Sequence, residues 1–139
     1  MSKELKVPCS GIIVFDKDKT ILVATKLGNF SFPKGKRDKG ETDLETAWRE
    51  LREETGLTSE HVQLITNEYF DELSSKGNPS IRYFVGRLVK QLDIITFDEE
   101  ELATVAWYGI DEALSLIKFK TERKNILVEA HKKYQNIMG

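Results

Sequence analysis

Apolar residues gather in short runs along this chain, and polar residues, glycine and proline separate the runs. Residues 10–26 hold two such runs around a polar turn at 16–19, a pattern that predicts a pair of strands. Similar runs at 61–73 and 80–90 predict two more strands, and a shorter strand is expected at 104–110. The chain should therefore build a sheet whose strands are partly joined as hairpins.

Three segments have helical signals instead. Thr42 and Glu45 form a T-x-x-E capping box that predicts the start of the first helix, and Gly56 predicts its end. Residues 111–117 predict a short helix. A longer helix is expected at 121–138, where apolar residues recur at roughly helical spacing: Ile126, Leu127, Ala130, Tyr134 and Ile137.

The order of these elements predicts an α/β fold with a mixed sheet flanked by helices. Between the second strand and the first helix, glycines and a proline punctuate residues 28–41, for which we expect a loop. A chain of 139 residues is long enough for one sizeable core but not for two. We therefore expect residues 1–139 to form a single domain.

The amino-acid composition says more about the kind of protein and its cellular compartment than about its function. With 40% hydrophobic and 32% charged residues, the chain has the profile of a globular protein. Its net charge of -2 gives no overall reason to expect binding to nucleic acid or to an anionic membrane. Cys9 is the only cysteine, and the first residues lack the apolar stretch of a cleaved secretion signal. We therefore expect a cytoplasmic protein without disulfides. We also expect a monomer.

Three glutamates crowd one turn of the first predicted helix. Glu50, Glu53 and Glu54 are spaced i, i+3 and i+4, so their carboxylates converge on one face, where like charges repel. Such hard oxygen ligands suit Mg²⁺ or Mn²⁺, and a cation there would relieve the repulsion. The alternative is a solvated acidic face, which is the commoner explanation when "ELREE" is considered by itself.

The residues around these glutamates favour a metal site over a solvated acidic face. From Gly35 to Leu57 the chain follows the pattern G-x5-E-x7-R-E-U-x-E-E-x-G-U, where U is apolar. The pattern is the signature of the Nudix hydrolases, and this sequence resembles that family at every specified position: Gly35, Glu41, Arg49, Glu50, Leu51, Glu53, Glu54, Gly56 and Leu57.

The resemblance implies an α/β/α sandwich and hydrolysis of a nucleoside diphosphate linked to another group. By position, it implies that Glu50, Glu53 and Glu54 bind the metal together with the Gly35 carbonyl. It also implies that two other residues, Glu41 and Arg49, pair with each other and fix the loop against the helix. Mg²⁺ is the expected cofactor, with Mn²⁺ as a substitute.

The general base remains open among several carboxylates. Glu53 and Glu54 are candidates on the helix itself. The acidic run at 98–102 precedes Trp107 in the region where many family members place a further catalytic or metal-binding glutamate. Alignment to Trp107 favours Glu100 or Glu101, although an acidic run by itself is more often a solvated loop.

Further segments resemble the asymmetrically cleaving diadenosine tetraphosphate hydrolases of this family. These are "FPKGK", "GETDLETAWRE", "SIRYFVGRL" and "AWYGIDEALSLIKFKTERKNILVEAHKKY". The resemblance implies that Tyr83 and Phe119 stack on adenine, for which flat apolar rings are suited. Packing in the core is the alternative for both rings. The implied reaction yields ATP and AMP from diadenosine tetraphosphate.

A chain of phosphates also needs cations. Candidates are Lys34, Lys36, Lys76 and Arg82, with Lys118 and Lys120 further along; a solvated loop is the alternative for most of them. We favour Lys34 because it directly precedes Gly35. Where the subfamily commonly reads P-K-G-H, this chain has Lys36 in place of histidine, which puts the substrate identity in doubt.

Two other functions therefore stay open. "FPKGK" also resembles the segment of messenger-RNA decapping members, and basic loops occur in diphosphoinositol polyphosphate members, so RNA 5′ ends or diphosphoinositol phosphates are alternative substrates. A binding module that senses a nucleotide without cleaving it belongs to a different class. Such a module would be expected to lose metal-site glutamates, and all of them are present here.

Overall fold

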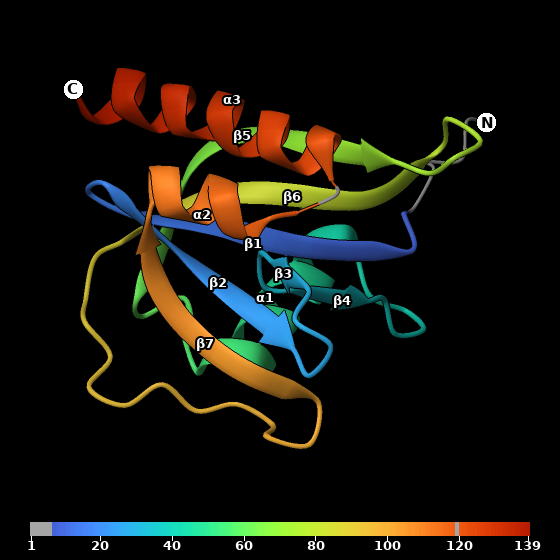
Figure 1. The fold of residues 1–139 in the computed structure, drawn as a ribbon, viewed down its shortest axis with the longest axis horizontal. Helices are drawn as coiled ribbons and strands as arrows, with labels where there is room; N and C mark the ends of the chain where they lie inside the picture. The colour runs from blue at the N-terminus through green and yellow to red at the C-terminus, as the bar shows by residue number, and fades with distance from the viewer. Residues whose placement is uncertain (1–6, 119) are drawn as a thin grey trace.

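The computed structural model describes residues 7–118 and 120–139 (Figure 1). The strands are β1 (Cys9–Asp16), β2 (Lys19–Thr25), β3 (Phe30–Ser31), β4 (Lys34–Lys36), β5 (Val62–Leu73), β6 (Pro79–Leu88) and β7 (Leu102–Gly109). The helices are α1 (Asp43–Thr55), α2 (Ile110–Leu116) and α3 (Thr121–Met138). Within the described ranges, no helix has the length and apolar character that a membrane crossing requires.

The sheet is mixed, as the sequence predicts. Its strand order is β3-β2-β1-β6-β5, while β4 pairs with β1 and β7 pairs with β2. Only the central pair of β1 and β6 is parallel among the pairs that the described residues form. Strand β1 carries the fully buried run from Ile12 to Phe15, because helices cover the sheet on both faces there.

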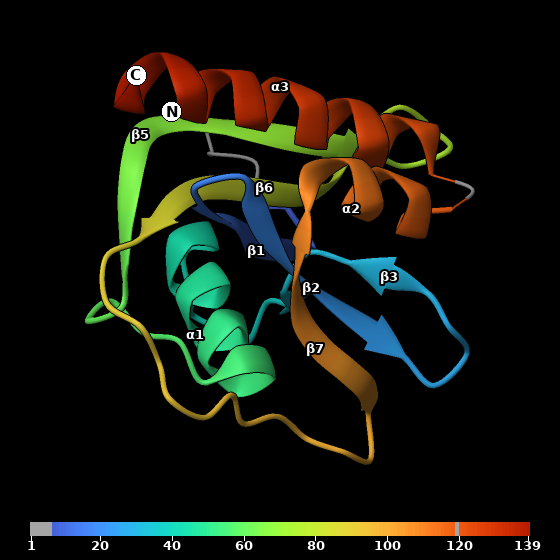
Figure 2. The ribbon, with the colours of Figure 1, turned by 60° about the vertical axis from the view of Figure 1, so that its left-hand side comes forward.

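The helices form two layers around the sheet (Figure 2). Helix α1 covers one face, where Ala47 and Leu51 pack against Ile12 and Val14 of β1. Helices α2 and α3 cover the other face, where the core includes Ile13, Phe15, Tyr83, Ala113 and Leu127. The alternation of side chains along β1 thus feeds two cores, and the α/β/α sandwich is confirmed.

Helix α1 begins and ends where the sequence predicts. The Glu45 N–H donates to the Thr42 hydroxyl at 3.1 Å, and the Thr42 N–H donates to the Glu45 carboxylate at 2.9 Å. Gly56 ends the helix with a φ of 84°, a left-handed conformation that glycine adopts without strain. Because Ala47 and Leu51 face the sheet, the glutamates are turned away from that core.

The expectation of an uninterrupted loop at 28–41 is wrong, because the segment contains β3 and β4. Strands of two and three residues are too short to show any periodicity in the sequence. Strand β4 pairs with β1 so that Gly35 lies opposite Ser10. This pairing fixes the backbone of β4 beside α1. Gly35 of the signature therefore lies next to the helix that carries the signature glutamates.

Candidate metal and catalytic site

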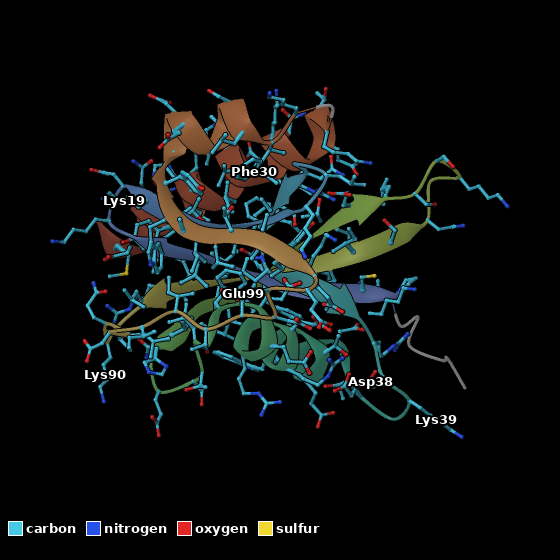
Figure 3. All side chains as sticks on the ribbon, turned by 60° about the horizontal axis from the view of Figure 1, so that its bottom comes forward. Lys19, Phe30, Asp38, Lys39, Lys90 and Glu99 are labelled. Atoms are coloured by element: carbon cyan, nitrogen blue, oxygen red, sulfur yellow. The ribbon has the colours of Figure 1, made fainter. Side chains whose placement is uncertain are left out.

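Carboxylates from two segments line a hollow of about 280 Å³, which we call the acidic hollow. Its lining residues are Glu50, Glu53 and Glu54 of α1 together with Asp98, Glu101 and Leu102. The loop before β7, on which Glu99 is labelled in Figure 3, runs past α1 (Figure 2) and contributes Asp98 and Glu101 to the hollow. The three helix glutamates predicted from the signature therefore do share one cavity.

Glu54 is a partly buried carboxylate that also accepts a hydrogen bond from the backbone of β4. The Lys34 N–H of β4 donates to Glu54 Oε1 at 2.9 Å. Burial raises the pKa of Glu54 to about 7, and the Lys34 hydrogen bond acts in the opposite direction. Burial likewise raises the pKa of Glu50, against the effect of the neighbouring Arg49 guanidinium. Both carboxylates are thus held in surroundings that disfavour their negative charge.

Gly35 is required by a close approach between β4 and α1. A Cβ atom at this position would overlap the carboxyl group of Glu50. Any side chain at this position would force the Glu50 carboxylate or the β4 backbone to move. The position of the signature glycine is thereby explained by packing, and its backbone lies beside the predicted metal ligands.

Arg49 ties the preceding loop to the helix, and the predicted pair with Glu41 is present. Its Nε and Nη2 atoms donate to the Glu41 carboxylate at 2.7 and 3.0 Å, and Nη2 also donates to the Lys36 carbonyl at 2.8 Å. Its Nη1 donates to Glu50 at 2.9 Å and reaches Glu53 at 3.2 Å. The Arg49 hydrogen bond lowers the pKa of Glu41 to about 2.

We expect Arg49→Lys to lower the free energy of unfolding by about 1–2 kcal/mol, because a lysine ammonium cannot reproduce the bidentate fork or reach the Lys36 carbonyl as well. Denaturant unfolding of both chains measures the difference. Arg52→Lys is the matched control, since Arg52 is exposed on the same helix. Equal stability of the Arg49→Lys chain and the wild type would contradict this role.

A second cavity, the basic cavity, has a volume of about 610 Å³. Its charged lining residues are all cationic: Lys34, Lys118, Lys120 and Arg123. Phe30 adds an aromatic ring and lies on the side of the sheet that α2 and α3 cover (Figure 3). The Arg123 guanidinium donates two hydrogen bonds, of 2.7 and 2.9 Å, to the Glu72 carboxylate. The lining therefore combines positive charge with an aromatic ring.

Residues 5–130 match the family model described as NUDIX domain. This chain belongs to the Nudix family. It is 40% identical over 103 residues to the asymmetrical bis(5′-nucleosyl)-tetraphosphatase of Rattus norvegicus, across 71% of this chain and 67% of that protein. The mRNA-decapping enzyme subunit 2 of Arabidopsis thaliana is 28% identical over 113 residues, across 79% of this chain and 30% of that protein.

A solved structure shares the Nudix fold. The binary complex of the C. elegans Ap4A hydrolase superposes with a TM-score of 0.81 at 19% identity, covering 92% of this chain and 98% of that chain. The family resemblance read from the signature is therefore confirmed. This chain is a Nudix hydrolase similar to asymmetrical Ap4A hydrolases.

Nudix hydrolases generally need a divalent metal ion, and the acidic hollow fits one by its chemistry. Its donors are carboxylate oxygens, which hard divalent cations prefer. A cation there would also offset the unfavourable burial of Glu50 and Glu54. Among residues 7–118 and 120–139, no three Asp, Glu, His or Cys side chains stand as a ready metal-binding set, and Arg49 contacts both Glu50 and Glu53.

The predicted cations lie in different places. Lys34 lines the basic cavity and its backbone reaches Glu54, as expected of a residue beside the site. Lys36 is exposed on β4, and Lys76 is exposed in the turn between β5 and β6. Arg82 lies on the α1 side of the sheet and bonds to Asp71, so it does not line the basic cavity. Of these four, only Lys34 lines the basic cavity, and its N–H also contacts Glu54 of the acidic hollow.

Of the two aromatic rings predicted to stack on adenine, the structure describes only Tyr83. Tyr83 is 0% exposed and meets Phe32 edge to face in the core, so a base could reach its ring only after these side chains moved. As it lies in this structure, Tyr83 is a core residue. Phe119 falls outside the described residues. Phe30, which sequence reasoning did not single out, supplies the aromatic ring of the basic cavity.

The structure also separates members of the acidic run at 98–102. Glu100 and Glu101 are both exposed, but only Glu101 lines the acidic hollow. Asp98 lines the hollow as well and was missed as a site residue, although the run itself signalled it. Arg123 was also missed; its signal was a charged residue at helical spacing with the buried Ile126 and Leu127.

Proposed function

We propose that this Nudix hydrolase cleaves diadenosine tetraphosphate asymmetrically to ATP and AMP, with Mg²⁺ as its metal. The position of Lys34 carries the proposal. Its N–H donates to Glu54 in the acidic hollow, and the same residue lines the basic cavity. A polyphosphate crossing Lys34 would have one phosphate at the carboxylates and its other phosphates among the cations.

The basic cavity supports a nucleotide at the far end of that polyphosphate. Lysine and arginine groups form strong, charge-assisted bonds to phosphate oxygens. The Phe30 ring offers an aromatic face of the kind that a flat base contacts. The relatives from Rattus norvegicus and C. elegans are named for hydrolysis of this class of dinucleotide, which supports the choice of substrate.

The reaction replaces one phosphorus–oxygen bond by another. The oxygen of a water molecule bonds to phosphorus, the bridging oxygen leaves with one nucleotide, and the water loses a proton. A bound divalent cation neutralises the phosphates and lowers the pKa of its water. In this chain Glu50, Glu53 and Glu54 would hold the cation, with the Gly35 carbonyl as a further oxygen ligand.

A carboxylate of the chain must take the proton of that water. We assign this role to Glu54, because the Lys34 N–H fixes one of its oxygens and leaves the other to accept a proton. Glu53 and Glu101 line the same hollow and are the alternatives. Glu100 is the weakest candidate, since its side chain does not line the hollow.

A second candidate substrate is the 5′ end of RNA. The similarity to the decapping subunit of Arabidopsis thaliana favours it, and so does the exposed Lys36 next to Gly35. RNA binding through such lysines would weaken steeply with salt. Diadenosine tetraphosphate remains our first choice because the basic cavity combines an aromatic ring with several cations, which suits one nucleotide and its phosphates.

We expect the ratio kcat/KM to be highest for diadenosine tetraphosphate within a panel that also holds capped RNA, diphosphoinositol phosphates and nucleoside triphosphates. Turnover should stop when a chelator removes Mg²⁺, because the carboxylates cannot neutralise phosphates themselves. Rates for each substrate, with Mg²⁺ and with chelator, provide the measurement. A higher kcat/KM for capped RNA would favour the second candidate. Metal-independent turnover would contradict both.

We also propose a cytoplasmic setting and a monomeric state. The lone Cys9 is compatible with a reducing compartment, because the chain has no second cysteine for an internal disulfide. Light scattering coupled to size exclusion would measure the mass in solution. A mass near 15.9 kDa is the expected result.

A further inference from the structure

Arg82 is the centre of a polar cluster on the α1 side of the sheet. Its Nε and Nη2 atoms donate to the two Asp71 oxygens of β5 at 2.8 and 2.9 Å. Its Nη1 donates to Asp43 Oδ2 at 3.1 Å, and the Tyr69 ring lies 3.9 Å from the guanidinium carbon. These side chains are mostly buried, apart from Tyr69. Each of the three guanidinium nitrogens thus donates one hydrogen bond to β5 or α1.

Asp43 receives a second arginine from the other side. Arg37 follows β4, and its Nη1 lies 3.8 Å from Asp43 Oδ1. The Arg37 backbone is itself fixed, because its N–H donates to the Pro8 carbonyl at 2.9 Å. Asp43 is the first residue of α1. The start of the helix is therefore hydrogen-bonded to Arg82 of β6, while Arg37 adds a longer ion pair without a hydrogen bond.

The acidic hollow depends on where this helix sits. Glu50 lies about two helical turns beyond Asp43, so a tilt at the start of α1 displaces its carboxylate. That carboxylate already touches the Gly35 backbone so closely that no Cβ atom fits between them. The bond from the Lys34 N–H to Glu54 spans the same junction. Small movements of α1 against β4 would thus disturb two ligand groups at once.

We propose that Arg82, Asp71 and Asp43 form a clamp that positions α1 so that its glutamates can bind the metal. Arg82 is then a positioning residue that acts through Asp43 and touches neither metal nor substrate. This inference rests on the proposed function, because it takes the acidic hollow as the metal site.

The test removes the guanidinium and follows the helix and the metal separately. In Arg82→Met, hydrogen exchange of the amides at 43–49 should be faster in the metal-free chain, because the helix start is released. Mn²⁺ or Mg²⁺ should raise the Tm of this variant less than that of the wild type. The kcat should fall roughly tenfold while KM changes less, as expected for displaced catalytic groups.

Two further variants keep the test informative if Arg82→Met folds poorly. Arg82→Lys retains the charge without the fork, and Asp71→Asn weakens the bidentate bond; both should give intermediate exchange and intermediate metal stabilisation. Arg87→Met is the matched control, because Arg87 lies on the same strand and bonds across to Gln63 of β5 without touching α1. It should behave as the wild type in every assay.

A purely structural role would look different. If the Arg82 variants lose Tm but keep wild-type exchange at 43–49 and the wild-type metal-induced rise in Tm, the proposal is overturned. The exchange and metal readouts need no substrate. They therefore separate this proposal from the proposed function, which fails if the wild type binds metal but hydrolyses no dinucleotide.

Discussion

Glu54→Gln should lower kcat for diadenosine tetraphosphate by about 100- to 1,000-fold, because an amide can neither accept the proton of water nor bind a cation as a carboxylate does. The fold should remain intact. The amide oxygen can still accept the Lys34 hydrogen bond, and the change removes a charge that burial disfavours. The free energy of unfolding should therefore stay within about 1 kcal/mol of the wild type.

Two measurements decide this prediction: steady-state turnover with Mg²⁺, and denaturant unfolding of the metal-free chain. Glu60→Gln is the matched control, because Glu60 is exposed just beyond α1 and does not line the acidic hollow. The control should keep wild-type turnover. Wild-type turnover in Glu54→Gln would contradict both roles proposed for Glu54, as a metal ligand and as the general base.

Gly35→Ala is expected to have the second largest effect. The new methyl group would overlap the Glu50 carboxyl group, so either β4 or the Glu50 side chain must move. Overpacking of this kind costs about 1–3 kcal/mol of stability. Displacement of Glu50, one carboxylate of the proposed metal site, should also lower turnover by about 100-fold. Unfolding and turnover of the same preparation measure the two effects together.

Gly109→Ala provides the comparison for Gly35→Ala. A Cβ atom at Gly109 would meet no heavy atom within 4 Å, and its φ of -59° suits alanine. This variant should therefore keep the turnover of the wild type, and its loss of stability should be no more than alanine costs at the N-cap of α2. If Gly35→Ala were equally active, the contact between the β4 backbone and Glu50 would not matter for catalysis.

The sequence predicted those parts of the fold that depend on local signals. Thr42, Glu45 and Gly56 act within a few residues of themselves, so the bounds of α1 could be predicted closely. The short strands β3 and β4 could not, because their existence depends on pairing with β2 and β1 rather than on any pattern of their own. The same pairing places Lys34 against Glu54, a contact that no local motif encodes.

In the candidate site, too, the sequence predicted the features set by local spacing but not those set by long-range packing. Glu50, Glu53 and Glu54 share a helix face by spacing alone, and they line one hollow in the structure. Arg82 and Tyr83 were predicted together as substrate contacts, yet neighbouring residues of a strand point to opposite faces of the sheet. Arg82 therefore meets α1, while Tyr83 is buried against Phe32. Which face is which depends on long-range packing.

The most direct test of the account is the identity of the products formed from diadenosine tetraphosphate. With Mg²⁺, chromatography should show ATP and AMP in equal amounts; chelation should stop the reaction, and added Mg²⁺ should restore it. That result would support both the acidic hollow as a metal site and the path across Lys34. Two molecules of ADP, or ATP and AMP released at the same rate in chelator, would contradict it.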